Sequence, residues 1–169
     1  MARFDEVPDV EWARDWELNV MSAVRCCRRA LPLMRHRGWG RIVNVASSAG
    51  KRPSARWPHY ATTKAALLGL TMVLADTYAR EGITVNAVCP GPVSSPAWTA
   101  EGGLADRLAE ERGVDRREVL DRVAAGIPIG RMGEPEEIAE AIAFLCGAKA
   151  SFVNGAALSV DGGNVRIVV

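Results

Sequence analysis

The segment His-Tyr-Ala-Thr-Thr-Lys, residues 59–64, places a phenol and an ammonium group four residues apart. At this spacing Tyr60 and Lys64 lie on the same face of a helix. A free phenol has a pKa of about 10 and is a poor proton donor or acceptor at neutral pH. A nearby ammonium group favours the phenolate and lowers that pKa. The pair predicts acid–base chemistry by Tyr60, although this spacing alone more often marks a helix-edge tyrosine beside a solvated lysine.

A serine thirteen residues before Tyr60 offers a second hydroxyl group. Ser47 ends the segment Arg-Ile-Val-Asn-Val-Ala-Ser, which is short, β-branched and typical of a strand. Two hydroxyl donors aimed at one substrate oxygen would stabilise the negative charge that develops there. Ser48 is an alternative donor, and alternation along a strand predicts that the two hydroxyls diverge. Either serine alone is also compatible with a turn.

The elements that must position these residues alternate between helices and strands. Strands separated by helices favour an α/β fold with a parallel sheet, whose ligands bind beyond the carboxyl ends of the strands. The segment 91–130 is rich in proline and glycine, and we expect it to be a mobile or inserted substrate loop with two short helices. The patterns predict helices over 9–36, 58–80, 101–112, 115–125 and 134–147, and strands over 41–47, 83–90 and 157–161.

The two long helices carry more specific signals. Asp9 is the expected N-cap of the first, Pro32 is expected to distort its last turns, and Gly38 is expected to end it after a basic cluster. The helix at 58–80 is apolar on nearly all sides. We therefore expect both of its flanks to be buried.

Composition and charge narrow the class of protein. The chain has 169 residues, a formal net charge of +1, 49% hydrophobic residues and 24% charged residues. This predicts one globular domain over 1–169. An apolar run long enough for a membrane span is lacking, the first residues do not resemble a secretory signal, and the balanced charge disfavours nucleic acid as a partner. We expect a cytoplasmic protein that binds neither a membrane nor nucleic acid.

The cysteines do not have the spacing of metal ligands. No Cys-x-x-Cys pair occurs, and His36 and His59 lie near no cysteine cluster. We expect no metal site. All four cysteines are predicted to be reduced and mostly buried: Cys26, Cys27, Cys89 and Cys146.

Four residues match the catalytic tetrad of the short-chain dehydrogenase/reductase family in type, order and spacing: Asn19, Ser47, Tyr60 and Lys64. The surrounding sequence also resembles that family. The resemblance covers nearly the whole chain and is weakest over 91–126. The matching signatures are the serine strand at 40–50, the Pro-Gly strand at 82–93 and the C-terminal segments 127–139 and 160–163.

The resemblance implies a role for each member of the tetrad. Tyr60 would protonate or deprotonate the substrate oxygen, and Ser47 would orient and polarise the carbonyl. Lys64 would lower the pKa of Tyr60 and hold the nicotinamide ribose. Asn19 would hold a water that links Lys64 to solvent.

The resemblance also implies a cofactor, NAD or NADP, and a small alcohol, ketone, or enoyl- or ketoacyl-like carbonyl substrate. Pro90, Gly91 and Val93 would border the nicotinamide. Ser95 stands where the family often has threonine and would keep the hydroxyl contact. A homo-oligomer, dimer or tetramer, is expected on the same basis.

One part of the family pattern is missing from this sequence. Neither the glycine-rich nucleotide loop, Thr-Gly-x-x-x-Gly-x-Gly, nor the Asn-Asn-Ala-Gly segment occurs. The expected fold is therefore the C-terminal part of a Rossmann-type doubly wound parallel sheet that lacks its first βαβ half. We expect an unpaired edge at strand 41–47, exposed Trp12 and Trp16, and marginal stability of the lone chain.

Three functional readings remain open. The chain is a truncated oxidoreductase that is inactive alone, a non-catalytic interaction module that pairs with full-length relatives through helices 9–36 and 58–80, or an active enzyme with an unusual cofactor mode. The substrate and the choice between NAD and NADP are not decided. Apolar residues in the substrate loop or just after it are expected to line a pocket or to serve packing alone: Trp98, Leu104, Ile127 and Met132.

Overall fold

A three-stranded parallel sheet forms the centre of the computed structural model, which describes residues 3–166. The strands are β1 (Gly40–Val45), β2 (Ile83–Pro90) and β3 (Ala157–Val160), in the spatial order β1-β2-β3. Their register pairs Gly40 with Ile83 and Ala87 with Ala157. The parallel α/β architecture predicted from the alternation of helices and strands is confirmed.

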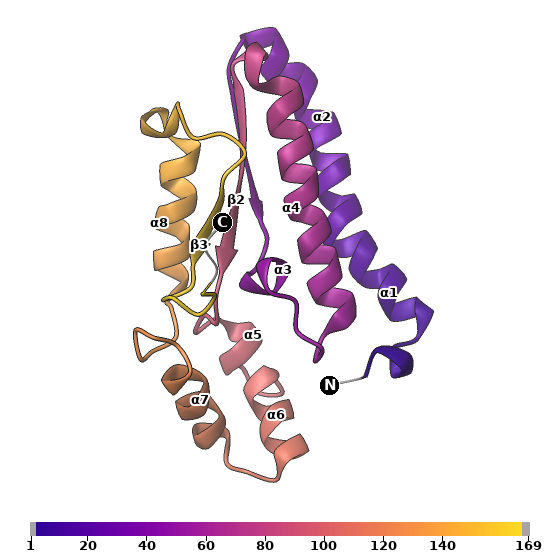
Figure 1. Ribbon diagram of the computed structural model, residues 1–169, viewed down its shortest axis with the longest axis vertical. Helices are drawn as coiled ribbons and strands as arrows, with labels where there is room; N and C mark the ends of the chain where they lie inside the picture. The colour runs from indigo at the N-terminus through magenta and orange to yellow at the C-terminus, as the bar shows by residue number, and fades with distance from the viewer. Residues whose placement is uncertain (1–2, 167–169) are drawn as a thin grey trace.

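Helices cover both faces of this sheet (Figure 1). On one face lie the helix formed by α1, a π-helical turn and α2, and beside it the long helix α4; on the other lies α8. Three further helices lie beyond the carboxyl ends of the strands, below the sheet in Figure 1. The helices are α1 (Asp9–Trp16), the π turn (Glu17–Met21), α2 (Ser22–Arg37), α3 (Ser48–Lys51), α4 (Pro58–Tyr78), α5 (Pro96–Thr99), α6 (Leu104–Arg112), α7 (Arg116–Ala125) and α8 (Pro135–Cys146), with 3₁₀ turns at Phe4–Glu6, Ala79–Glu81 and Ala148–Ala150.

The middle strand carries the core. β2 is covered on both sides, so its sequence is an apolar run instead of an alternating one. Ile83 and Val85 pack with Cys27 and Leu31 of α2, whereas Val88 packs with Ile138 and Leu145 of α8. Two buried polar groups are satisfied by specific partners. Asn44 donates its amide N–H to Thr71 Oγ1 at 2.9 Å, and the Asn86 side chain bonds to the backbone of Val153 and Ala156.

The first long helix differs from its prediction in two details. Pro8, in extended conformation, is the N-cap, and Asp9 is the first helical residue. The helix continues through Pro32 to Arg37, and its irregular turn lies at Glu17–Met21. Its predicted end is confirmed. Gly38 has a φ of 62°, a left-handed conformation that glycine adopts without steric cost.

Burial of α4 on both flanks was predicted wrongly for this chain. One face is buried through Ala61, Leu67 and Ala75, but Met72 is 56% exposed and Val73 63% exposed. The cysteine prediction is likewise half wrong, since all four are free but Cys26 and Cys146 are exposed. Within residues 3–166, no helix is long and apolar enough to cross a membrane.

The unpaired edge expected at strand 41–47 is β1, which has only β2 as a neighbour among the described residues. Val45 at the end of this strand is 46% exposed. Trp16 is exposed and Trp12 partly so. The strand is also shorter than predicted, because the chain leaves the sheet after Val45 to begin α3.

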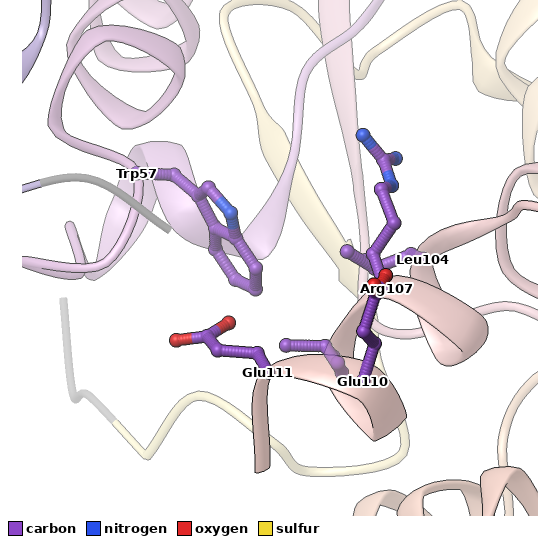
Figure 2. A pocket seen from close by; sticks show the side chains of 6 residues that line it. Trp57, Leu104, Arg107, Glu110 and Glu111 are labelled. Atoms are coloured by element: carbon purple, nitrogen blue, oxygen red, sulfur yellow. The ribbon is translucent and has the colours of Figure 1, made fainter. Parts of the chain in front are cut away.

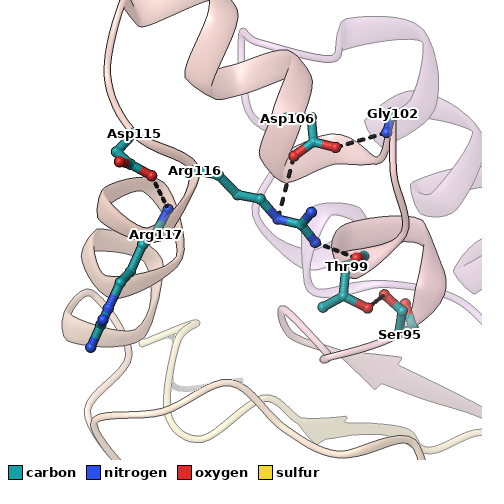
Figure 3. A network of polar contacts seen from close by, with 7 residues as sticks. All are labelled: Ser95, Thr99, Gly102, Asp106, Asp115, Arg116 and Arg117. Atoms are coloured by element: carbon teal, nitrogen blue, oxygen red, sulfur yellow. Dashed lines mark hydrogen bonds and ion pairs between the residues drawn. The ribbon is translucent and has the colours of Figure 1, made fainter.

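The segment 91–130 is helical and has a small core of its own. Leu108 and Val119 are buried where α6 and α7 meet, with Trp98 packed against them. Figure 3 shows how polar contacts join these helices. Arg116 of α7 contacts Asp106 of α6 at 3.3 Å and donates to the backbone oxygen of Thr99 in α5. The two predicted charged helices are present, and α5 is an additional short helix.

Candidate active site

A cavity of about 760 Å³ opens at the carboxyl ends of the strands. This size is typical of sites for small molecules. Its walls come from the loop after β1, the start of α4, the end of β2 and helices α5 and α6. The lining residues include Asp15, Ser47, Ser48, Arg52, Trp57, His59, Tyr60, Gly91, Pro92, Ala97, Trp98, Leu104, Arg107 and Asn164.

The structure brings Ser47 and Tyr60 together in this cavity. Ser47 is the extended N-cap of α3, and its Oγ accepts a hydrogen bond from the backbone N–H of Ala49 at 3.1 Å. Tyr60 lies in the first turn of α4, which starts at Pro58, a residue suited to the first position of a helix. The two side chains both line the cavity, and the Ser47 hydroxyl is close enough to Tyr60 to lower the pKa of the phenol. Both residues therefore belong to the same part of the cavity wall.

Burial raises the pKa of Tyr60 above its ordinary value, because the phenolate loses hydration. The hydroxyl of Ser47 opposes this rise, and the negative charge of Asp15 adds to it. The net shift is upward, and Lys64, which the sequence predicts to lower the pKa of Tyr60, is not among the causes of this shift. Desolvation outweighs the opposing contribution, and Tyr60 is a neutral phenol at neutral pH.

Lys64 lies next to Tyr60 but faces its ring. Nζ stands 5.7 Å from the centroid of the Tyr60 ring and donates to the backbone oxygen of Val45 at 3.0 Å. Burial lowers the pKa of Lys64, while Asp15 and Cys89 raise it. The ammonium is thus held between the end of β1 and the start of α4.

Asn19 reaches the same region through one intermediate residue. Its Nδ2 donates to Thr63 Oγ1 at 3.1 Å, and that hydroxyl donates to the backbone oxygen of Tyr60 at 2.8 Å. Asn19 lies inside the π-helical turn, a type of helix irregularity that is frequent at functional sites. The turn was not foreseen, since no glycine or proline marks it.

Asp15 and His59 form a pair at the cavity wall that sequence reasoning missed. His59 Nε2 lies 3.7 Å from Asp15 Oδ2, and the imidazole packs edge-on to Trp12. His59 Nδ1 is buried and has no hydrogen-bond partner among the described residues. The two residues are 44 positions apart, so only their contact across α1 and α4 reveals the pair.

The remaining predicted site residues divide into two groups. Gly91 lines the cavity, and so do Trp98 and Leu104. Five others do not line it in the part of the chain that the structure describes. Pro90 ends β2, Val93 bridges to Gly133, Ser95 caps α5, and Ile127 and Met132 are buried in packing.

Comparison with known proteins identifies the family of this chain. A family model described as Enoyl-(Acyl carrier protein) reductase matches residues 1–164. The chain belongs to the short-chain dehydrogenase/reductase family. Short-chain reductase protein NovJ of Streptomyces niveus is 37% identical over 155 residues, which are 92% of this chain and 56% of NovJ. Cis-4-hydroxycyclohexanecarboxylate dehydrogenase of Sinomonas cyclohexanicum is 41% identical over 98% of this chain and 61% of its own length.

Solved structures of this family share the fold. L-sorbose reductase from Gluconobacter frateurii, complexed with NADPH and L-sorbose, aligns with a TM-score of 0.89 and 37% identity. The alignment covers 99% of this chain and 63% of the reductase. The chain therefore spans about three fifths of the length of these short-chain dehydrogenase/reductase relatives. Its membership of an NAD(P)-dependent oxidoreductase family is established, while the activity of the chain itself is a separate question.

Proposed function

We propose that this chain carries the proton-transfer and substrate-binding part of an NAD(P)-dependent oxidoreductase that interconverts an alcohol and a ketone, or an enoyl- or ketoacyl-like carbonyl. The observation that carries the proposal is that Ser47 and Tyr60 both line a cavity at the carboxyl ends of parallel strands, where Ser47 acts on the pKa of Tyr60. Relatives named for the oxidation of a hydroxy acid and the reduction of a sugar support the same reaction class.

Tyr60 and Ser47 have different proposed roles at the substrate oxygen. In the reductive direction Ser47 donates a hydrogen bond to the carbonyl oxygen, and Tyr60 donates the proton that completes the alcohol. The raised pKa of Tyr60 keeps the phenol protonated at neutral pH, as this direction requires. In the oxidative direction Tyr60 must first lose its proton, so rates should increase with pH.

The residues around Lys64 fit a nicotinamide cofactor. An ammonium group has three donors, and Val45 takes one of those of Lys64. The others are suited to ribose hydroxyls beside Tyr60. NAD(P)H, when bound, supplies the hydride that the carbonyl carbon receives. Gly91 at the end of β2 presents backbone without a side chain to the same cavity. Asn19 positions Tyr60 through Thr63, and we propose that it also holds a water in the proton path.

The lone 169-residue chain is proposed to be inactive, because the glycine-rich loop that binds pyrophosphate does not occur in this sequence. Titration of the purified chain with NADH and NADPH, followed by nucleotide fluorescence, tests this. We expect no binding in the micromolar range. A chimera that adds the preceding segment of L-sorbose reductase should bind NADPH and gain carbonyl reduction that Tyr60→Phe abolishes. A chimera that binds NADPH but reduces a panel of ketones equally well with Tyr60→Phe would contradict the assignment.

A second candidate is an interaction module that pairs with itself or with full-length relatives. The exposed apolar residues Met72 and Val73 on α4 and Leu33 on α2 favour this candidate. Light scattering of the purified chain tests it, with Val73→Lys as the variant. A dimer or tetramer that the lysine dissociates supports pairing through this face, and a monomer argues against it.

A further inference from the structure

Two arginines line the cavity without a counter-charge of their own. Arg52 follows α3 and Arg107 lies on α6. Neither side chain forms a hydrogen bond or ion pair with any residue in the range 3–166. Arg80 and some other arginines also have no side-chain partner among the described residues, but several elsewhere are paired. Arg116 contacts Asp106, for example, and Arg131 binds Glu137 through both terminal nitrogens.

The charge of the cavity is consequently positive. Asp15 is the one carboxylate among the described residues that line the main cavity, and it lies beside His59. Glu110 and Glu111 line a smaller cavity that Arg107 also lines. The two positive charges of Arg52 and Arg107 outnumber the single negative charge of Asp15. Clefts lined by one sign of charge concentrate the field and attract ligands of opposite sign.

Arg107 is placed where it can reach a bound molecule. It lines both the main cavity and a smaller one of about 290 Å³ between Trp57 and α6. Figure 2 shows its guanidinium extending away from the carboxylate of Glu111, which points toward Trp57. The neighbouring wall is apolar, formed by Ala97, Trp98 and Leu104. A small molecule with one oxygen at Ser47–Tyr60 would thus meet an apolar surface and then a cationic rim.

We infer that the substrate of this site is a small hydroxy or oxo acid whose carboxylate is held by Arg107, with Arg52 adding positive charge. The inference rests on the proposed function for the end of the molecule that reacts. The arginine fork matches both oxygens of a carboxylate, and such charge-assisted bonds are about twice as strong as neutral ones. Loss of one pair should weaken binding about tenfold or more.

Tryptophan fluorescence of the purified chain without nucleotide tests this, since Trp57 and Trp98 line the cavity. The probes are levulinate, which carries a ketone and a carboxylate, and methyl levulinate, which lacks the charge. We expect saturable levulinate binding at millimolar concentrations and at least about tenfold weaker binding of the ester. Arg107→Ala should remove this preference, and Arg107→Lys should keep part of it.

Arg80→Ala is the matched control, because Arg80 is exposed beyond the far end of α4 and also lacks a side-chain partner among the described residues. It should bind like the unchanged chain. Equal binding of acid and ester, retention of the preference in Arg107→Ala, or no saturable signal would each overturn the inference. Tyr60→Phe should leave the preference intact. The binding assay therefore tests the carboxylate preference without any hydride transfer. Failure of the proposed reaction and failure of the proposed carboxylate binding can be told apart in this way.

Discussion

The carboxylate of Asp15 lies 3.7 Å from Nε2 of His59, the residue directly before Tyr60. Burial is the main cause of the raised pKa of Tyr60, and the negative charge of Asp15 adds to it; for Lys64, burial lowers the pKa and Asp15 opposes this lowering. Asp15 acts on Tyr60 in the same direction as burial, and Ser47 acts against both. The raised pKa of Tyr60 thus results mainly from burial, with smaller contributions from a hydroxyl at the end of the sheet and a carboxylate of α1.

Asp15→Asn should lower the pKa of Tyr60, because it removes a negative charge that disfavours the phenolate. The chain has two tyrosines, so tyrosinate absorbance during an alkaline titration, with Tyr60→Phe to assign the signals, measures the shift. Asp76→Asn, an exposed change on α4, is the control and should leave the titration unchanged. A Tyr60 pKa that stays the same or increases in Asp15→Asn would contradict this role.

Ser47→Ala should move the pKa of Tyr60 in the opposite direction. Alanine removes the hydroxyl that lowers this pKa, so the increase in pKa that burial causes is no longer opposed by Ser47. The same absorbance titration measures the effect, and Ser48→Ala is the neighbouring control. Circular dichroism should accompany both, because Ser47 also accepts the N–H of Ala49 at the start of α3. An equal rise in both serine variants would argue against a specific effect of Ser47 on Tyr60.

Alkaline pH should destabilise the fold through Tyr60. Its folded-state pKa lies above the unfolded value of about 10, so the unfolded state loses the proton first. The contribution to stability is therefore full below about pH 10 and decreases as the pH rises through the folded pKa. Urea denaturation at increasing pH should show a smaller loss for Tyr60→Phe than for the unchanged chain. If the free energy of unfolding decreased equally with pH in Tyr60→Phe and in the unchanged chain, Tyr60 would not be the cause of the alkaline destabilisation.

Thr63→Val should destabilise the chain by about 1–3 kcal/mol, because it leaves the amide of Asn19 without its acceptor. Thr63 is fully buried, whereas the neighbouring Thr62 is exposed and bonds only to Pro58. Thr62→Val is therefore the control and should cost less. Urea denaturation measures both. Equal stability of the two variants would mean that the Asn19–Thr63 contact contributes little.

Acid should weaken the start of α8 through Glu137. Its carboxylate binds Arg131 through both oxygens at 2.7 Å and accepts the N–H of Glu134 at 2.8 Å. These partners lower the pKa of Glu137 to about 2. The resulting stabilisation is present above the unfolded value of about 4.3 and is lost as the pH falls through about 2.

Glu137→Gln should accordingly lower the melting temperature at neutral pH, with a difference from the unchanged chain that shrinks as the pH falls from about 4.3 toward 2. Thermal scans across this range provide the measurement. Glu136→Gln, an exposed neighbour in the same first turn, should show no such pH dependence. A deficit for Glu137→Gln that is constant with pH would contradict the assignment.

Much of this architecture could be predicted because the determining signals are local. The runs at β1 and β2, the left-handed Gly38 and the start of α4 at Pro58 each follow from neighbouring residues. The family signature also identified Ser47 and Tyr60, which both line the cavity. Residue type and spacing sufficed for these features.

The rest depends on contacts that no local pattern encodes. The Asp15–His59 pair joins α1 to α4, and the π turn at Asn19 has no breaking residue to announce it. The direction of the Tyr60 pKa shift required knowledge of its burial, because an ammonium four residues away does not reveal how much water the phenol loses. The exposed flank of α4 could not be predicted either, since an apolar sequence does not specify which face finds a partner.

The helices α5, α6 and α7 keep their own small core at Leu108 and Val119, and Arg116 ties them to one another. Ala97, Trp98, Leu104 and Arg107 face the cavity from this same unit, whereas Ser47 and Tyr60 belong to the sheet and α4. The residues proposed to select the substrate and those proposed to transfer the proton thus lie in separate stretches of the chain. Exchanging residues 96–125 between homologues would therefore change one wall of the cavity and leave Ser47 and Tyr60 in place.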